Sequence, residues 1–290
     1  GYRDADVAVV SAHAVWALPL AWALAKRAKA PLVYNPHELE TRTPTMTGVK
    51  KTLAEQVEAR FIRRCQVVTA VNDEIADWYA GHYRIARPLV VVNYPAEVTR
   101  GRPARDLRGE LGLRDDEVLF VHTGHLTEGR NIPLILEEFA AGARHHVLFV
   151  GAGDMQSLVD EAAARSPFIH RMDPVPPDEV VSVVAGADMS LALIEILSQS
   201  YAWGSPNKLF EALAAGVPVL ASDVPEVRRR LGPLAGELIL SSPKDQLRGF
   251  LARLDRPMAL SYREHLTPLP TWEEGVEPLV ETYRALLQGG

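Results

Sequence analysis

The chain has 290 residues, 47% of them hydrophobic and 23% charged, which is ordinary for a globular protein and leaves room for two domains. Its formal net charge of −6 argues against a nucleic-acid-binding protein, whose phosphate contacts require a basic surface. The single cysteine, Cys65, excludes an internal disulfide framework and an all-cysteine metal site.

No apolar stretch is long enough to span a bilayer, and the opening residues lack the charged-then-apolar pattern of a signal peptide. Together with the cysteine content, this pattern predicts a cytoplasmic protein.

Along the chain, short apolar runs alternate with segments of helical periodicity. This alternation is typical of parallel strands joined by right-handed crossover helices, so the predicted fold class is α/β. In the first part we expect a long helix from about Thr47 to Arg64 and four strands, at 7–10, 31–34, 67–71 and 89–92.

The long helix carries or adjoins basic residues that could touch an anionic membrane bearing a lipid acceptor: Lys50, Lys51, Arg60, Arg63 and Arg64. Glu55 and Glu58 dilute this charge, so a solvated helix face is favoured over a peripheral contact with the inner face of a membrane.

The second part of the chain predicts six strands, which is a full doubly wound sheet, near 118–123, 146–150, 168–171, 189–195, 217–221 and 236–240. A polar stretch from Glu97 to Asp106 is the expected linker. The domains are therefore predicted at 1–98 and 99–270, followed by a segment of helical periodicity at 271–290.

The first domain opens directly on a strand, and its four expected strands make it incomplete beside the second domain. An edge strand at 7–10 with open backbone groups and an apolar face predicts association with another chain at that edge. The alternative is a short variant whose own helices cover the edge.

A segment from Gly204 to Ser222 has the pattern of a loop, an amphipathic helix and a buried strand. Pro206 fits the first helical turn, and the free amides around Ser205 to Lys208 form an anion site with the helix dipole. Lys208 and Glu211 share a helix face, so they can bind phosphate and sugar hydroxyls of one nucleotide-sugar. An ordinary surface Lys–Glu pair is the alternative.

Residues 208–219 (KLFEALAAGVPV) resemble the donor-site helix of family 4 glycosyltransferases, which have the two-domain GT-B fold. Further stretches carry the same resemblance in the expected order over most of residues 115–245: 120–124 with Arg130 and Asn131, then 147–153, 172–179 and 187–193.

The resemblance implies two Rossmann-like, doubly wound parallel-sheet domains and a final helix, 271–290, that crosses back to the first domain. It also implies transfer of a sugar from a nucleoside-diphosphate sugar to a hydroxyl acceptor, with retention of configuration and with neither a metal nor a cofactor. Relatives usually begin with further strand–helix units, so a truncated or separately encoded first half is expected. A noncatalytic nucleotide-sugar-binding subunit and a sugar-nucleotide epimerase stay as alternatives.

In the second domain, the resemblance places Arg130 and Lys208 beside the leaving diphosphate, where fixed cations lower the barrier most. It places Glu211 on the ribose hydroxyls and backbone groups of 172–175 on the base. The donor-binding residues that it implies are Gly124, His125, Asp173, Pro174, Val175, Ser205, Pro206, Asn207, Leu209 and Glu211.

Two positions depart from the family pattern. His125 follows Gly124 where relatives have an arginine, and Trp203 stands where they have a glutamate that contacts the sugar. Trp203 could stack on a sugar face or anchor its loop to the core. The base and the sugar cannot be read from the sequence.

In the first domain, His13 follows the opening strand and corresponds to a histidine that lies near the transferred sugar in relatives. Ligands of open α/β sheets bind beyond such strand ends, so His13 joins Arg130 and Lys208 in the predicted catalytic set. The acceptor side is predicted at His37, Glu38, Asn72 and Asn93. The alternatives are a loop cap for His37, a helix N-cap for Asn72 and a turn for Asn93.

Overall fold

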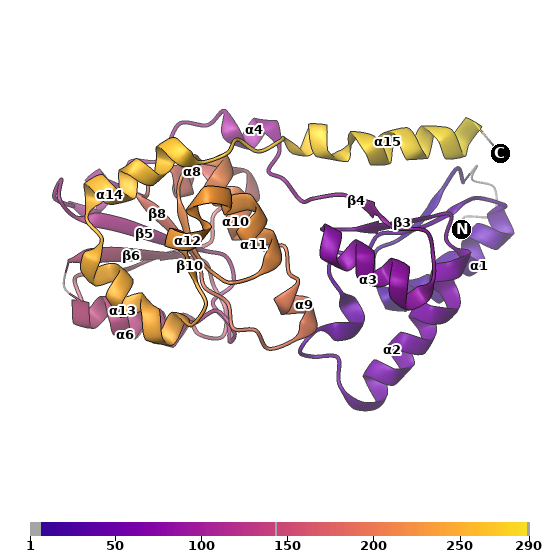
Figure 1. The fold of residues 1–290 in the computed structure, drawn as a ribbon, viewed down its shortest axis with the longest axis horizontal. Helices are drawn as coiled ribbons and strands as arrows, with labels where there is room; N and C mark the ends of the chain where they lie inside the picture. The colour runs from indigo at the N-terminus through magenta and orange to yellow at the C-terminus, as the bar shows by residue number, and fades with distance from the viewer. Residues whose placement is uncertain (1–6, 143, 289–290) are drawn as a thin grey trace. The chain divides into compact units, whose positions relative to one another are not determined.

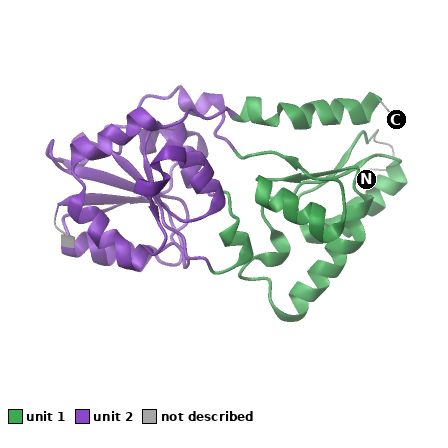
Figure 2. Ribbon diagram, in the orientation of Figure 1, with its two compact units in different colours: residues 1–93, 197–205, 272–290 green, residues 94–196, 206–271 purple. Residues whose placement is uncertain are grey.

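The computed structural model describes residues 7–142 and 144–288, and the outermost residues of the expected domains, 1–6 and 289–290, lie outside these ranges. The chain divides into two compact units (Figure 2). Unit 1 comprises residues 1–93, 197–205 and 272–290, and unit 2 comprises 94–196 and 206–271. All five tryptophans of the sequence fall within the ranges of unit 1.

Unit 1 is built on a parallel sheet whose strands follow chain order (Figure 1). The strands are β1 (Val10–Ala12), β2 (Leu32–Tyr34), β3 (Val67–Ala70) and β4 (Leu89–Val90). The helices are α1 (Leu18–Ala28), α2 (Gly48–Phe61), α3 (Asp73–Tyr83), α9 (Gln199–Ala202) and α15 (Trp272–Gln288). Short 3-10 turns lie at Val15–Ala17, Glu40–Arg42 and Ile62–Arg64.

The first strand begins later than the sequence suggests, at Val10 rather than residue 7. Val10 pairs with Leu32, so residues 7–9 lie opposite the left-handed C-cap of α1 at Lys29 and the segment to Pro31, which has no N–H to donate. Among the described residues, β1 has a neighbour only on its β2 side, and association at this edge stays a prediction.

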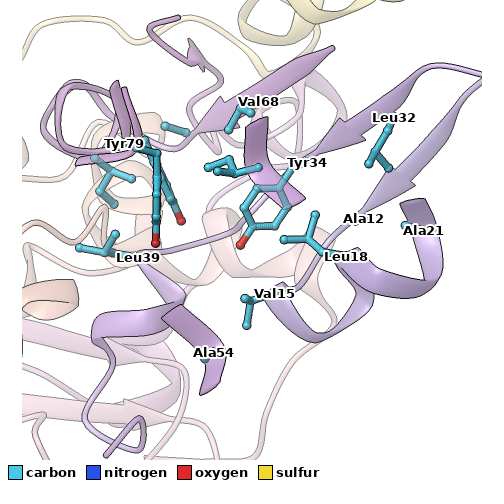
Figure 3. Close-up of a cluster of buried hydrophobic side chains, with 14 of the residues drawn as sticks. Ala12, Val15, Leu18, Ala21, Leu32, Tyr34, Leu39, Ala54, Val68 and Tyr79 are labelled. Carbon is cyan, nitrogen blue, oxygen red and sulfur yellow. The ribbon is translucent and has the colours of Figure 1, made fainter. Parts of the chain in front are cut away.

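The core of unit 1 is a cluster of buried hydrophobic side chains, among them Tyr34 and Tyr79 (Figure 3), and a buried carboxylate bonds to it. Glu58 of α2 is fully buried, and its oxygens accept hydrogen bonds from the hydroxyls of Tyr34, Tyr79 and Tyr83 at 2.7, 3.1 and 2.6 Å. Thr41 adds a fourth hydroxyl at 3.2 Å. Glu58 therefore does not belong to a solvated helix face, because its position on α2 points into the core.

Unit 2 contains a six-stranded parallel sheet in the order β10-β9-β8-β5-β6-β7. This is the doubly wound order in which the first and fourth strands of the domain are neighbours and the crossovers diverge between them. The strands are β5 (Val118–Thr123), β6 (His145–Val150), β7 (Ile169–Met172), β8 (Met189–Ala192), β9 (Val219–Ser222) and β10 (Ile239–Leu240).

Helices cover both faces of this sheet (Figure 1). On one face α6 (Ile132–Gly142) packs against α7 (Gln156–Arg165) and α13 (Pro243–Arg253), and on the other α8 (Val180–Ala185) packs against α10 (Asn207–Ala214). The remaining helices are α4 (Glu97–Arg100), α5 (Leu107–Leu111), α11 (Pro225–Leu231), α12 (Ala235–Leu238) and α14 (Arg256–Ser261), with 3-10 turns at Pro177–Glu179, Gly232–Leu234 and Tyr262–His265.

Two expected strands of unit 2 are three residues shorter than the apolar runs suggest. The strand expected at 189–195 ends at Ala192, because the next amides bond elsewhere: Ile194 N donates to Ser222 Oγ at 2.9 Å and Glu195 N to Gly129 O at 2.9 Å. Of the strand expected at 236–240, only the last two residues are extended, since α12 occupies the preceding ones.

The stretch expected as a linker, 97–106, is packed on unit 2. It contains α4, Arg102 forms an ion pair with Asp178, and Arg105 N donates to Ser182 O at 3.0 Å. The first segment of unit 1 instead ends at Asn93. None of the helices in the described ranges is long and apolar enough to cross a membrane.

Candidate donor site

The carboxyl ends of β5 and β8 mark the point in unit 2 where the strand order reverses, and ligands of such sheets bind there. β5 ends in His122 and Thr123, which are polar and buried, and the chain then turns at Gly124 with a positive φ of 92°. This strand end therefore presents polar groups where the fold places a ligand.

The loops after β5 and β6 lie against each other. Gly124 N donates to Val150 O at 2.9 Å and Leu126 N to Ala152 O at 3.0 Å. A Cβ atom on Gly151 would stand 1.9 Å from the carbonyl oxygen of Gly124, so only glycine permits this approach. The Gly-Ala-Gly turn at 151–153 thus shapes the loop that carries Gly124 and His125.

Helix α10 supplies two charged residues of the site, Lys208 and Glu211. Pro206 is its N-cap, with extended backbone, and therefore precedes the first helical turn instead of lying within it as expected. The buried face of the helix comprises Leu209, Phe210, Ala212 and Leu213. This packing leaves Lys208 and Glu211, one turn apart, to face the end of β5.

Lys208 contacts the end of β5 through its ammonium group. Its Nζ lies 2.6 Å from Nε2 of His122. Burial lowers the pKa of Lys208 to about 7, the positive charge of Arg130 acts in the same direction, and the carboxylate of Glu211 opposes both. The three side chains therefore act on one another within one site, and an anion that arrives beside Lys208 would raise its pKa and favour the ammonium form.

Glu211 bonds to the residue next to His122. Its Oε2 accepts a hydrogen bond from Thr123 Oγ1 at 3.0 Å. Burial raises the pKa of Glu211, while the hydrogen bond from Thr123 and the charge of Lys208 lower it. Such a carboxylate is held in place by one hydrogen-bond donor and can accept further hydrogen bonds from the hydroxyls of a ligand.

A pocket of about 470 Å³ opens at this point. Six of the predicted donor residues line it: Gly124, His125, Pro174, Val175, Asn207 and Glu211. Val150, Gly151, Ala152, Pro177, Val180 and Thr123 complete the lining.

The other predicted donor residues lie outside this lining. Leu209 is fully buried in the core, and Asp173 is exposed and bonded to Arg171 at 2.8 Å. Ser205 ends the 197–205 segment of unit 1, and its Oγ is buried with no hydrogen-bond partner in the described structure. Leu209 thus supports the helix instead of facing a ligand.

In unit 1, the predicted histidines lie together. The exposed rings of His13 and His37 stack with their centroids 5.5 Å apart, and His13 Nε2 lies 3.1 Å from Ser11 Oγ. Burial, and secondarily His37, lower the pKa of His13. Glu38 is exposed and accepts a hydrogen bond from Ser200 Oγ at 3.0 Å.

The amide of Asn72 is fully buried and already bonded at both ends. Its Oδ1 accepts from Ile75 N at 3.0 Å, which caps α3, and its Nδ2 donates to Trp203 O at 2.7 Å. The side chain of Trp203 packs against the core of unit 1. Both residues therefore have the structural roles that were the alternatives to ligand contact, whereas Asn93 is exposed.

Sequence reasoning assigned no role to His122 and Thr123, the two residues to which Lys208 and Glu211 bond. A signal was present, because two polar side chains end an otherwise apolar strand directly before a glycine turn. Within a buried parallel strand, such residues need partners or a ligand.

Comparison with known proteins identifies two domains. The family model for glycosyl transferases group 1 matches residues 117–256, and the model for Glycosyltransferase Family 4 matches residues 2–99. No curated protein matches the chain.

Several solved structures share the fold. Sucrose-phosphate synthase from Thermosynechococcus elongatus aligns over 100% of this chain and 76% of its own, with a TM-score of 0.77 and 17% identity. HepE from Anabaena, in complex with UDP-glucose, aligns over 96% of this chain and 78% of its own, with a TM-score of 0.71 and 13% identity.

The two family models together span most of the chain, one on each parallel-sheet domain, and the aligned structures share that architecture. The chain belongs to the glycosyltransferases of the GT-B fold.

Proposed function

We propose that this glycosyltransferase takes a UDP-sugar as donor and passes the sugar to a hydroxyl acceptor, with retention of configuration and without a metal. The observation that carries the proposal is that Lys208 and Glu211, one turn apart on α10, both bond to the end of β5 beside the pocket at the switch point. The UDP-glucose complex of HepE supports the choice of UDP.

Charge complementarity supports a diphosphate at this place. Lys208 and Arg130 supply two cations that affect each other electrostatically, and α10 begins beside them with amides that have no intrahelical partner. As the bond from sugar to phosphate breaks, negative charge collects on the diphosphate, and these groups stabilise it. Two fixed cations can do what a bound metal does for other diphosphate leaving groups.

Glu211 is proposed to bind the ribose hydroxyls, with the backbone around 172–175 on the base and His13 near the sugar or acceptor. Among the described residues that line the pocket, Glu211 is the single carboxylate, so the pocket does not offer the carboxylate pair of a double-displacement glycosidase. We therefore propose that a leaving phosphate oxygen takes the acceptor's hydroxyl proton while the acceptor oxygen attacks from the same face of the sugar.

A binding and turnover experiment tests this function. UDP is expected to raise the melting temperature more than GDP, ADP or dTDP, and Glu211→Gln should weaken UDP binding by about tenfold, because the amide is a poorer acceptor for ribose hydroxyls. Glu195→Gln, outside the pocket lining, is the matched control.

Product formation from labelled UDP-sugars, followed by NMR of the anomeric centre, tests turnover and stereochemistry. An inverted product would refute retention, and loss of activity in EDTA that Mg²⁺ restores would refute metal independence. Wild-type levels of UDP binding by the Glu211 variant would remove that residue from the site.

A further inference from the structure

His122 is a fully buried histidine at the end of β5, and neither the family resemblance nor the proposed function assigns it a role. Its ring tilts against Phe149 at a centroid distance of 5.3 Å. Its Nε2 lies 2.6 Å from Nζ of Lys208. Among the described residues, the polar partner of this ring is thus the cation that is proposed to bind the donor.

The imidazole of His122 is uncharged at neutral pH. Burial lowers the pKa of His122 well below its usual value, and the cations Lys208 and Arg130 lower it further. An ammonium group can only donate, so Lys208 Nζ donates to Nε2, and the single ring hydrogen lies on Nδ1. This is a charge-assisted hydrogen bond, stronger than one between neutral groups.

We propose that His122 is a positioning residue, which holds the Lys208 ammonium at the donor pocket and thereby couples binding of the donor diphosphate to uptake of a proton by Lys208. The inference rests on the proposed function and extends it to the pH dependence of donor binding.

The direction of that pH dependence follows from the groups that face Lys208. These are His122 on β5, Arg130 in the loop after it and Glu211 on α10, while α8, β8 and β9, which also pack on α10, contribute no titratable side chain. Lys208 has a pKa of about 7, and a bound diphosphate raises it. Above pH 7 binding must therefore take up a proton, and donor affinity falls as the pH rises.

Titration calorimetry with UDP, from about pH 6 to about pH 8.5, tests the coupling in the whole protein. In wild type, the binding enthalpy at the upper end should differ between phosphate and Tris buffers, as proton uptake requires. His122→Phe keeps an aromatic ring but removes the hydrogen-bond acceptor. Loss of this acceptor disfavours the ammonium form of Lys208. UDP affinity at about pH 7.5 should fall about tenfold, and its decline should begin at lower pH.

His122→Gln restores an acceptor and should recover most of the affinity. The matched control is His146→Gln, and its UDP binding should equal that of wild type. His146 is also a buried histidine of this sheet and bonds to His170 at 2.9 Å, but it lies at the amino end of β6, away from the pocket.

If His122→Phe binds UDP like wild type at every pH while Lys208→Met binds UDP weakly, the positioning role of His122 is refuted and the proposed donor site stands. If Lys208→Met also binds like wild type, the proposed donor site fails with it. Should His122→Phe not fold, ¹⁵N NMR of the wild-type histidines decides: a neutral His122 protonated on Nδ1 at the lower end of this range, where Lys208 is an ammonium, supports the proposal, and titration of His122 near its ordinary pKa overturns it.

Discussion

The burial of Lys208 makes its charged form unfavourable in the folded protein. Its pKa of about 7 lies below the ordinary value near 10.4 of an unfolded chain. Between these two values the unfolded chain holds a proton that the folded protein has released, so the contribution of Lys208 to the free energy of unfolding rises with pH. Below about pH 7 its destabilising effect is fully present.

We therefore expect Lys208→Met to raise the free energy of unfolding below about pH 7, and the gain over wild type to shrink as the pH increases toward about 10. UDP affinity should drop by at least about tenfold, because the charge is lost. Denaturant unfolding at several pH values, with UDP titration on the same samples, measures both. A variant that is less stable than wild type at low pH would contradict this account of the buried ammonium.

At the level of elements, the turn after β6 holds the loop after β5. In Gly151→Ala the new Cβ would meet the Gly124 carbonyl, a backbone atom that cannot rotate away. We expect a loss of about 1–3 kcal/mol in stability and at least about tenfold weaker UDP binding. Gly249→Ala is the control, since its Cβ in α13 meets nothing within 4 Å and should stabilise by up to about 1 kcal/mol.

Helix α2 is held by the carboxylate of Glu58, which joins it to β2 and α3 through tyrosine hydroxyls. Glu58→Gln replaces one acceptor oxygen by a donor that faces hydroxyl groups, and is expected to cost about 2–4 kcal/mol. Glu55→Gln, on the same helix, removes only a half-buried ion pair with Arg42 and should cost less than about 1 kcal/mol. Equal melting temperatures for the two variants would show that the tyrosine hydroxyls are not held by charge.

At the scale of the molecule, the alternation of apolar runs was enough to predict two parallel-sheet domains, the second of them doubly wound. The same pattern did not predict where strands begin and end, as at β10. A short edge strand pairs with one neighbour, and local turns compete with that pairing. The sequence also located Lys208 and Glu211 from their spacing on one helix. The polar end of an apolar strand marked His122, but its partner Lys208 could not be predicted, because a contact between residues 86 positions apart leaves no local pattern.

The division of the chain was harder to foresee. Residues 197–205 join unit 1 although they follow β8 of unit 2, and they are held there by Asn72 and Glu38. Those are tertiary contacts of side chains that local composition describes only as good caps and loop residues. Composition alone therefore predicts contiguous domains, whereas tertiary hydrogen bonds join residues 197–205 to unit 1.

Every tryptophan lies within the ranges of unit 1, whereas the residues that line the donor pocket belong to unit 2. Tryptophan fluorescence therefore reports on unit 1. Intrinsic emission during denaturation follows the melting of that half, whereas far-ultraviolet dichroism follows both, so any gap between the two curves separates their stabilities. By the same logic, an emission change on adding UDP would show that nucleotide binding alters the surroundings of tryptophans in unit 1.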